Sequence, residues 1–282
     1  MLLDTRDHGR LARDGSTARN CARYHEGVEW ATMGRCEHCG QDHADKHLFC
    51  PNTGRVITSR LFAEGTLLEG KYRIGRKLGE GGMGAVFEAT HVMLDKRVAI
   101  KVLLPRNDEM AEQMSARLVR EARAASSTGH RNIALVTDMG QTERGSLFVV
   151  MEFLDGPTLH DVLEQHGRLP GARASDIVLQ LLSGLESVHR RGIIHRDLKP
   201  ENLILVASEE GTDELVKILD FGISKVTGTE QQLNLTSTGM MLGTPQFMSP
   251  EQARGEAGID HRTDIYSAGA IHYMMLTGTP PH

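Results

Sequence analysis

The chain has 282 residues, which is enough for one or two domains with a buried core. Its 39% hydrophobic and 24% charged residues are typical of a soluble globular protein, and 37 acidic against 32 basic side chains give a net charge of −5. Because no cluster of Lys and Arg supplies the cationic surface of a duplex-binding protein, nucleic acid is not an expected partner.

Three zones follow one another along the chain. Residues 1–33 are polar, without a helix or strand period, and are expected to be a disordered or non-native leader, because Met33 is a second candidate start. Residues 34–60 hold three cysteines, several histidines and turn residues, and regular apolar patterning begins at Tyr72. No apolar run approaches the roughly 18 residues of a membrane span, and the N-terminus lacks a signal-peptide core. We therefore expect a cytoplasmic protein.

All four cysteines lie within the first 50 residues, which in a reducing compartment favours metal binding over disulfides. Cys36 and Cys39 form a CxxC pair and Cys50 follows, in a zinc-ribbon-like knuckle over residues 34–60, although Thr53 stands where a ribbon would have its fourth cysteine. Cys36, Cys39 and Cys50 are therefore candidate zinc ligands, and a reduced, metal-free knuckle is the alternative. The sequence offers three choices for a fourth ligand: His43, His47 and the more distant Cys21.

The region from Tyr72 begins with strand signals and continues with helix signals. Residues 72–102 alternate glycine-rich turns with short β-branched runs, which predicts three antiparallel strands. Residues 108–127 predict a helix, and two short strands are predicted around 134–139 and 147–152. Residues 173–190 predict a second helix, with one apolar face formed by Ile177, Val178, Leu181, Leu182, Leu185 and Val188.

Residues 79–86, GEGGMGAV, have the pattern GxGxxGxV, whose glycines let the backbone approach phosphate oxygens closely. A dinucleotide-binding turn would need a helix directly afterwards, whereas the β-like run AVFEA follows; a glycine-rich hairpin without a ligand is the other alternative. Lys101 ends the apolar run VAIK and could neutralise phosphate charge, unless it is simply a solvated strand end. Glu121, on the following predicted helix, could pair with Lys101.

The most informative stretch is HRDLKPEN at residues 195–202, followed by DFG at 220–222. With the glycine-rich loop and Lys101 in this order and spacing, residues 72–282 resemble bacterial Hanks-type serine/threonine protein kinases. The resemblance implies an α+β, bilobal protein-kinase fold. Its N-lobe, residues 72–152, would be an antiparallel sheet plus one helix, and its C-lobe, residues 153–282, would be mostly helical.

The resemblance also implies the chemistry, in which ATP and Mg²⁺ are the cofactors and proteins with Ser or Thr hydroxyls are the substrates. Asp197 would accept or orient the hydroxyl proton and Lys199 would meet the transferred group, while Asn202 and Asp220 would hold Mg²⁺. The implied catalytic residues are Asp197, Lys199, Lys101, Glu121 and Thr244. The implied nucleotide contacts are Leu78, Gly79, Glu80, Gly81, Gly82, Met83, Gly84, Ala85, Val86, Ala99, Lys101, Met151, Glu152, Leu154 and Ile204.

Within this set, Leu78, Val86 and Ala99 would cover the adenine and Ile204 would lie below it. The adenine edge would bond backbone groups of Glu152 and Leu154, with Met151 as the gatekeeper. In the family the aspartate at Asp264 supports the backbone of the catalytic loop.

The segment between Asp220 and Ser249 is rich in Thr and Ser. Arg196, beside the catalytic aspartate, is expected in the core, where an unpaired cation needs an anion such as a phosphate. We therefore predict phosphorylation by this chain or by a sister molecule in a homodimer; an unmodified polar loop is the alternative. The predicted sites are Thr238 or Thr236, with Ser237 less favoured.

Kinases of this family continue through further helices after the position of residue 282. We therefore expect an incomplete C-lobe, in which Glu251 lacks its arginine partner and an apolar face on residues 265–276 is uncovered. Two functions follow: an ATP-dependent serine/threonine protein kinase that also phosphorylates its own activation segment, or an inactive kinase-like fragment or nucleotide-binding scaffold that acts by protein contacts.

Overall fold

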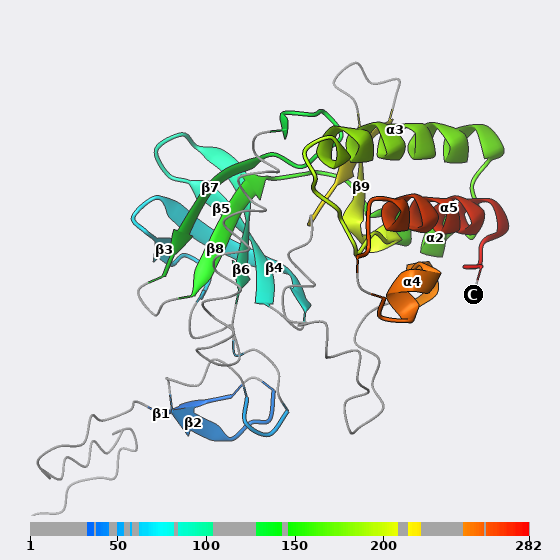
Figure 1. The fold of residues 1–282 in the computed structure, drawn as a ribbon. Coiled ribbons are helices and arrows are strands. Elements are labelled where there is room, and N and C mark those ends of the chain that lie inside the picture. Colours follow the sequence, from blue (N-terminus) through cyan, green and yellow to red (C-terminus); the bar gives the residue numbers. More distant parts are fainter. Residues whose placement is uncertain are drawn as a thin grey trace, which may run out of the picture.

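A sheet-rich lobe and a helical lobe lie next to each other, with a small cysteine-bearing hairpin apart from both (Figure 1). The computed structural model describes residues 33–36, 38–44, 50–53, 57, 62–81, 84–103, 128–142, 146–207, 214–220, 245–256 and 258–281. The hairpin consists of β1 (Met33–Arg35) and β2 (Asp42–Ala44). Met33, which we had predicted to belong to the leader, is thus the first residue of β1.

The N-lobe is one six-stranded sheet with the order β3-β4-β5-β6-β8-β7, in which all neighbours are antiparallel. The strands are β3 (Leu67–Leu68), β4 (Tyr72–Gly81), β5 (Gly84–His91), β6 (Lys96–Leu103), β7 (Val136–Gln141) and β8 (Leu147–Glu152). This confirms the three antiparallel strands predicted over residues 72–102 and the two predicted later, although β7 begins and ends two residues further along the chain.

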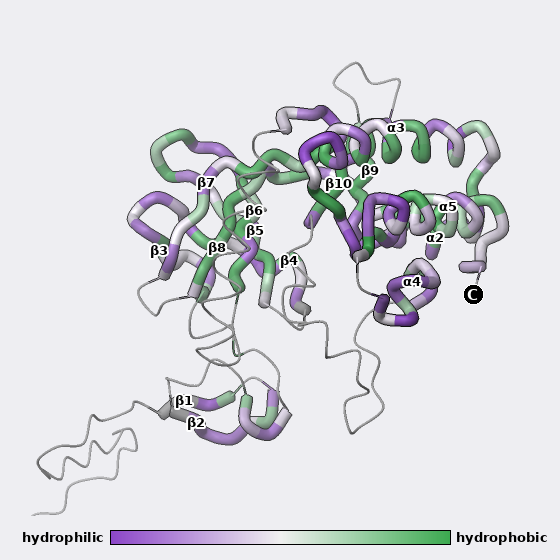
Figure 2. Tube along the Cα trace, viewed as in Figure 1, coloured by the Kyte–Doolittle hydropathy of each residue, from purple (hydrophilic) through white to green (hydrophobic). Residues whose placement is uncertain are grey.

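Strand β6 is buried on both faces, and this determines where Lys101 lies. Val98, Ile100 and Val102 belong to one apolar cluster of the lobe, whereas Ala99 and Leu103 belong to another. Because side chains alternate along a strand, Lys101 shares the face of Ala99 and Leu103. Figure 2 shows hydrophobic stretches on the central strands β6 and β8, and others in the helical lobe.

The C-lobe contains four helices and one hairpin among its described residues. They are α2 (Leu159–His166), α3 (Gly171–His189), α4 (Pro250–Ala253), α5 (Arg262–Thr277), β9 (Leu203–Ala207) and β10 (Glu214–Ile218), with 3₁₀ turns η2 (Pro200–Asn202) and η4 (Pro245–Phe247). The apolar face predicted for residues 173–190 is confirmed, because Ile177, Leu181 and Leu185 are fully buried on α3. Helix α2 was not predicted from the sequence. It begins with a capping box, in which the side chains of Thr158 and Asp161 each accept a hydrogen bond from the other residue's backbone N–H group.

Several predictions concern parts of the chain that the structure does not describe. The helix predicted over residues 108–127, almost all of the leader and the segment 221–244 lie outside the described residues. On α5, by contrast, the expected exposed apolar residues are present: Ile265, Tyr273 and Leu276 are all more than 40% exposed. In the described part of the chain, no helix combines the length and the apolarity that crossing a bilayer requires.

The two lobes are joined by the chain that leaves β8, and Gly156 in this connection packs tightly against β9. A Cβ atom on Gly156 would lie 2.1 Å from the carbonyl oxygen of Leu205. One residue further, the carbonyl oxygen of Pro157 accepts a hydrogen bond from the Leu205 N–H at 2.9 Å. The backbone of this connection is therefore held directly against the C-lobe hairpin.

We predict that Gly156→Ala lowers the free energy of unfolding by about 2–3 kcal/mol, because the new methyl group overlaps a backbone oxygen that cannot move away alone. Denaturant unfolding followed by circular dichroism measures the change. Gly171→Ala is the matched control, because a Cβ there meets nothing within 4 Å and alanine is favoured over glycine in a helix. Equal destabilisation by both substitutions would contradict the packing described here.

Candidate active site

The glycine-rich loop is the turn between β4 and β5. Gly79 pairs with Val86 and Gly81 pairs with Gly84 across the two strands. Since a strand and not a helix follows the loop, the dinucleotide-binding alternative is excluded. Gly84 has φ 154°, and a Cβ atom there would lie 1.8 Å from the carbonyl oxygen of Val102, so that only glycine fits.

The other predicted loop contacts lie on the same hairpin or fall outside the description. Leu78 is 41% exposed at the edge of the loop, and Glu80 forms an ion pair with Lys77 at 2.8 Å. Ala85 is buried in the core of the N-lobe. Gly82 and Met83 lie outside the described residues.

Three of the predicted adenine contacts form one apolar cluster. Ala99 and Met151 are buried in it, and Val86 packs against them. They come from β6, β8 and β5, which are neighbours or next neighbours in the sheet. The cluster therefore provides an apolar surface on the same face of β6 as Lys101, as the alternation of the strand requires.

The hinge after this cluster is anchored to both lobes through Glu152. Its Oε1 accepts hydrogen bonds from the backbone N–H of Leu135 and from Lys217 Nζ, each at 2.7 Å. Lys217 lies on β10, where it pairs with Ile204, the predicted floor of the adenine site. The ion pair is largely buried, since its side chains are 13% and 24% exposed. Sequence reasoning did not find Lys217, although its charge amid apolar neighbours on β10 was a usable signal.

Lys101 meets Asp220 between the two lobes. Lys101 Nζ lies 2.7 Å from Asp220 Oδ2, and the side chains are 14% and 24% exposed. Asp220 has φ 55°, a left-handed conformation that is uncommon for residues other than glycine. It is held in place by its neighbour Leu219, whose N–H donates to the carbonyl oxygen of Asn202 at 2.9 Å.

Asn202, Asp197 and Lys199 lie at the same end of the β9–β10 hairpin as Asp220. Leu203 pairs with Ile218, which brings the preceding Asn202 and the following Leu219–Asp220 segment together. Asn202 Nδ2 donates to the carbonyl oxygen of Asp197 at 2.8 Å, and Lys199 Nζ lies 3.4 Å from Asp197 Oδ2. The structure thus brings together five of the predicted polar residues, from three motifs: Lys101, Asp197, Lys199, Asn202 and Asp220.

The backbone of the catalytic loop is fixed by Asp264 at the start of α5. This carboxylate, 1% exposed, accepts hydrogen bonds from the backbone N–H groups of His195 and Arg196 at 2.8 Å and from His189 Nε2 at 2.7 Å. Burial alone would raise the pKa of Asp264, but the bond from His189, the electrostatic interaction with His195 and the bonds from the backbone N–H groups outweigh it and lower the pKa below its usual value. Asp264 therefore holds the backbone of the catalytic loop, as the family resemblance implied.

His195 connects the same loop to the strand end. Its Nε2 donates to the carbonyl oxygen of Leu219 at 2.8 Å, while its Nδ1 accepts from the Asp197 N–H at 3.3 Å. The ring thus lies between the residue next to Asp220 and the proposed catalytic aspartate. Any shift of one of these two segments would break a hydrogen bond of the other.

One expectation about this loop is wrong. Arg196 was expected in the core, whereas its side chain is exposed, because its left-handed backbone (φ 64°) directs the chain outward while Gln252 bonds its carbonyl oxygen at 2.8 Å. A solvated guanidinium does not require an anion, so this argument for a phosphate is lost. Further predicted residues lie outside the described part of the chain: Glu121, Thr244, Thr236, Ser237 and Thr238.

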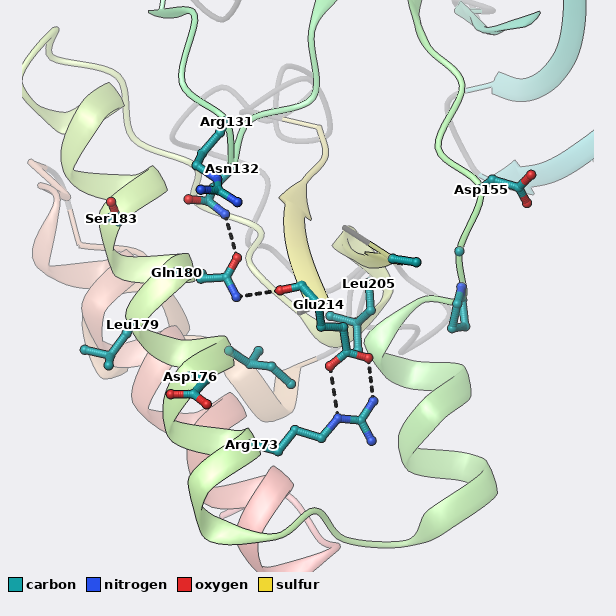
Figure 3. Close-up of a pocket in the computed structure, with 14 residues that line it drawn as sticks. Arg131, Asn132, Asp155, Arg173, Asp176, Leu179, Gln180, Ser183, Leu205 and Glu214 are labelled. Carbon is teal, nitrogen blue, oxygen red and sulfur yellow. Dashed lines mark hydrogen bonds and ion pairs between the residues drawn. The ribbon is translucent and has the colours of Figure 1, made fainter. Parts of the chain in front are cut away.

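A groove of about 1120 Å³ lies elsewhere, between α3 and the β9–β10 hairpin (Figure 3). None of the five convergent polar residues lines it. Its polar side chains largely bond one another: Arg173 binds Glu214 through two hydrogen bonds, and Gln180 bonds Asn132. The groove is therefore not the candidate reaction site in spite of its size. That site lies where the five polar residues converge, around Asp220.

Comparison with known proteins agrees with this geometry. Residues 72–282 match the family model described as protein kinase domain. The chain belongs to the protein kinase family. It is 47% identical over 213 residues to the serine/threonine-protein kinase pkn3 of Myxococcus xanthus, covering 75% of this chain and 38% of that protein. It is 39% identical over 219 residues to the serine/threonine-protein kinase PknB of Mycobacterium leprae, covering 76% of this chain and 33% of that one.

Solved structures show the same kinase fold. A crystal structure of the Mycobacterium tuberculosis PknI kinase domain superposes with a TM-score of 0.60 at 27% identity, covering 78% of each chain. The bilobal α+β fold implied by the sequence motifs is thereby confirmed. The chain spans between 26% and 38% of the length of the curated relatives pkn3, pkn2 and Pkn1 of Myxococcus xanthus.

We predict that Asp264→Asn lowers the free energy of unfolding by about 2–4 kcal/mol at neutral pH, because one buried N–H donor loses its acceptor. The lowered pKa means that the carboxylate stabilises the fold above its unfolded pKa, near 3.9, and that this contribution is lost as the pH falls through the folded value. The difference in the free energy of unfolding between wild type and variant should therefore become smaller as the pH is lowered from about 5 to below 3.

Urea unfolding at a series of pH values measures this difference. Asp176→Asn, the same change at an exposed position of α3, is the control and should leave the stability unchanged throughout. If the difference in the free energy of unfolding between wild type and the Asp264 variant stayed constant over this pH range, the charge of the carboxylate would not be what holds the catalytic loop.

Proposed function

We propose that this chain transfers the γ-phosphate of ATP to serine or threonine hydroxyls of proteins. The observation that carries the proposal is the convergence of Lys101 and Asp220, 2.7 Å apart, beside Asp197 and Asn202. These residues come from a strand of one lobe and a hairpin end of the other, so that the fold and not local sequence brings them together. Membership of the protein kinase family gives this arrangement its reaction class.

The donor set fits ATP with Mg²⁺. Asp220 and Asn202 offer a carboxylate and an amide oxygen, which are ligands that Mg²⁺ prefers. The amino group of Lys101 neutralises Asp220 at the position where a bound cation would lie. With Mg²⁺ held by Asp220 and Asn202, Lys101 would contact the phosphates of ATP. Mg²⁺ would supply charge neutralisation of the triphosphate.

Asp197 and Lys199 would act on the acceptor side of the reaction. Asp197 takes the proton of the substrate hydroxyl while that oxygen forms a bond to the γ-phosphorus and the bond to the β–γ bridging oxygen breaks, releasing ADP. Lys199 Nζ, 3.4 Å from Asp197 Oδ2, lies close enough to offset charge on the transferred group. The apolar cluster of Val86, Ala99 and Met151 would hold the adenine.

Two finer proposals rest on sequence alone. Autophosphorylation at Thr238 or Thr236 in a homodimer is supported by the Ser/Thr-rich composition of this segment and no longer by burial of Arg196. A cytoplasmic location is supported by the need for ATP and by cysteine usage typical of a reducing compartment.

We predict that Asp197→Asn lowers the rate of phosphate transfer from [γ-³²P]ATP to a generic protein acceptor by about 10²–10⁴-fold, because an amide cannot take the hydroxyl proton. Asp220→Asn should in addition weaken binding of ATP in the presence of Mg²⁺, since a ligand of the cation is lost. Isothermal titration calorimetry separates the two effects, because the Asp197 variant should still bind the nucleotide.

Asp95→Asn is the matched control. Asp95 is exposed in the β5–β6 turn with φ 48°, a conformation that asparagine tolerates, so the variant should retain full activity. A wild-type chain that binds ATP but transfers no more phosphate than the Asp197 variant would be a nucleotide-binding scaffold, and the proposed activity would be wrong.

A further inference from the structure

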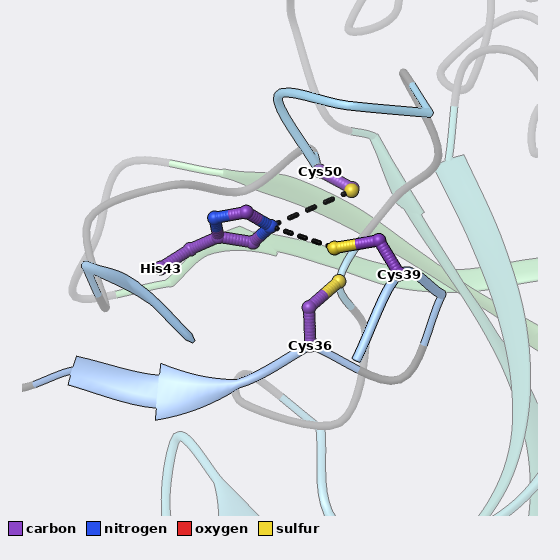
Figure 4. Close-up of side chains that lie close together, drawn as sticks. All are labelled: Cys36, Cys39, His43 and Cys50. Carbon is purple, nitrogen blue, oxygen red and sulfur yellow. Dashed lines mark hydrogen bonds between the residues drawn. The ribbon is translucent and has the colours of Figure 1, made fainter. Parts of the chain in front are cut away.

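The N-terminal hairpin gathers three thiols and one imidazole at a single point (Figure 4). The ligand atoms of Cys36, Cys39, His43 and Cys50 all lie within 4.8 Å of one another. His43 Nε2 lies 3.1 Å from Cys39 Sγ and 3.6 Å from Cys50 Sγ. With zinc–sulfur and zinc–nitrogen bonds of about 2.3 and 2.1 Å, tetrahedral ligand atoms lie roughly 3.5–3.8 Å apart. The cluster is therefore close to the spacing of a four-coordinate zinc site.

The backbone between β1 and β2 is shaped to present the CxxC pair. Gly40 has φ 71°, which residues other than glycine rarely adopt, and its N–H donates to the carbonyl oxygen of Cys36 at 2.9 Å. The N–H of Cys36 donates in turn to Gln41, and the N–H of His38 points at Cys36 Sγ at 3.4 Å. This tight turn brings two sulfurs to one side and leads directly into β2, which carries His43.

A second layer supports the sulfurs. Asn52 Nδ2 lies 3.6 Å from Cys39 Sγ and 2.9 Å from Gln41 Oε1. An N–H group directed at a sulfur favours the thiolate, which is the form that binds a metal. The side chain of Asn52 thus fixes Cys39 to the same turn that Gly40 forms.

This region is too small to be stabilised by apolar burial alone. Among the described residues, its apolar cluster consists of Cys36, Cys50 and Ile57, with Cys39 packed against them, and its strands are two of three residues each. Units of fewer than about 40 residues usually need disulfides, metals or oligomerisation, and these three cysteines are free thiols. Binding of a metal by three thiolates and one imidazole would supply the missing free energy.

We propose that Cys36, Cys39, His43 and Cys50 form a structural Zn²⁺ site. Three thiolates and one imidazole are a usual ligand set for structural zinc, and all four positions are filled by protein, which leaves none for catalysis. Of the three candidates for the fourth ligand, we choose His43, whose Nε2 lies within the cluster; His47 and Cys21 lie outside the described residues. The site shares no residue with the kinase centre, so that it stands or falls independently of the proposed activity.

The test uses the full chain, purified under reducing conditions. Mass spectrometry of the metal content should find one zinc ion per chain. Replacement by Co²⁺ should give tetrahedral ligand-field bands and a thiolate-to-cobalt charge-transfer band in the near ultraviolet. Cobalt at the oxygen ligands of the kinase centre gives no such band, so the spectrum distinguishes the two sites. This measurement needs no variant.

Variants then assign the ligands. Cys36→Ser and His43→Ala should abolish stoichiometric zinc binding, and Asn52→Ala should weaken it by about 10-fold, as expected for an outer-shell hydrogen bond. Cys21→Ser and His47→Ala are the matched controls and should bind zinc like the wild type. A wild-type chain without zinc and without the charge-transfer band, or a band lost in His47→Ala but kept in His43→Ala, would overturn the assignment.

Discussion

The two lobes meet at the ion pair of Lys101 and Asp220, and the candidate active site depends on this contact. Partly buried ion pairs contribute little net stability, because desolvation of both charges offsets their attraction. The pair is therefore better understood as a positional constraint than as a source of stability. It requires a lysine within a strand that is buried on both faces and a carboxylate in a left-handed conformation next to it. Each of these two features is unfavourable for folding by itself. Together they place a cation and a carboxylate where the phosphates and the metal of a metal-bound triphosphate can bind.

The carboxylate side of this contact is held by backbone hydrogen bonds that converge on a few buried groups. Asp264 binds the N–H groups of the catalytic loop, and His195 connects that loop to Leu219, the neighbour of Asp220. On strand β10 of the same hairpin, Lys217 binds Glu152 and so connects β10 to the hinge. Catalysis of phosphoryl transfer depends mainly on positioning, and this network provides it without flexible surface contacts.

Much of the site could be predicted from the sequence, because its residues lie in short motifs where spacing along the chain determines spacing in space. Asp197, Lys199 and Asn202 are of this kind, and the alternation of β6 placed Lys101. The ion pair of Lys217 with Glu152 joins residues 65 positions apart, so that no local pattern indicates the partner of Lys217, although a lysine among apolar residues marks its position. Likewise, the choice of His43 as the fourth zinc ligand depends on how β1 pairs with β2, which the sequence does not show. The exposure of Arg196 was mispredicted because it depends on backbone geometry that the motif does not encode.

The most direct test of the central claim is a crystal structure of the chain with Mg²⁺ and a non-hydrolysable ATP analogue. We expect that Asp220 and Asn202 coordinate the metal, that Lys101 contacts the phosphates and not Asp220, and that the adenine lies against Val86 and Ala99. A nucleotide bound in the groove beside α3, with the Lys101–Asp220 pair intact, would contradict the claim.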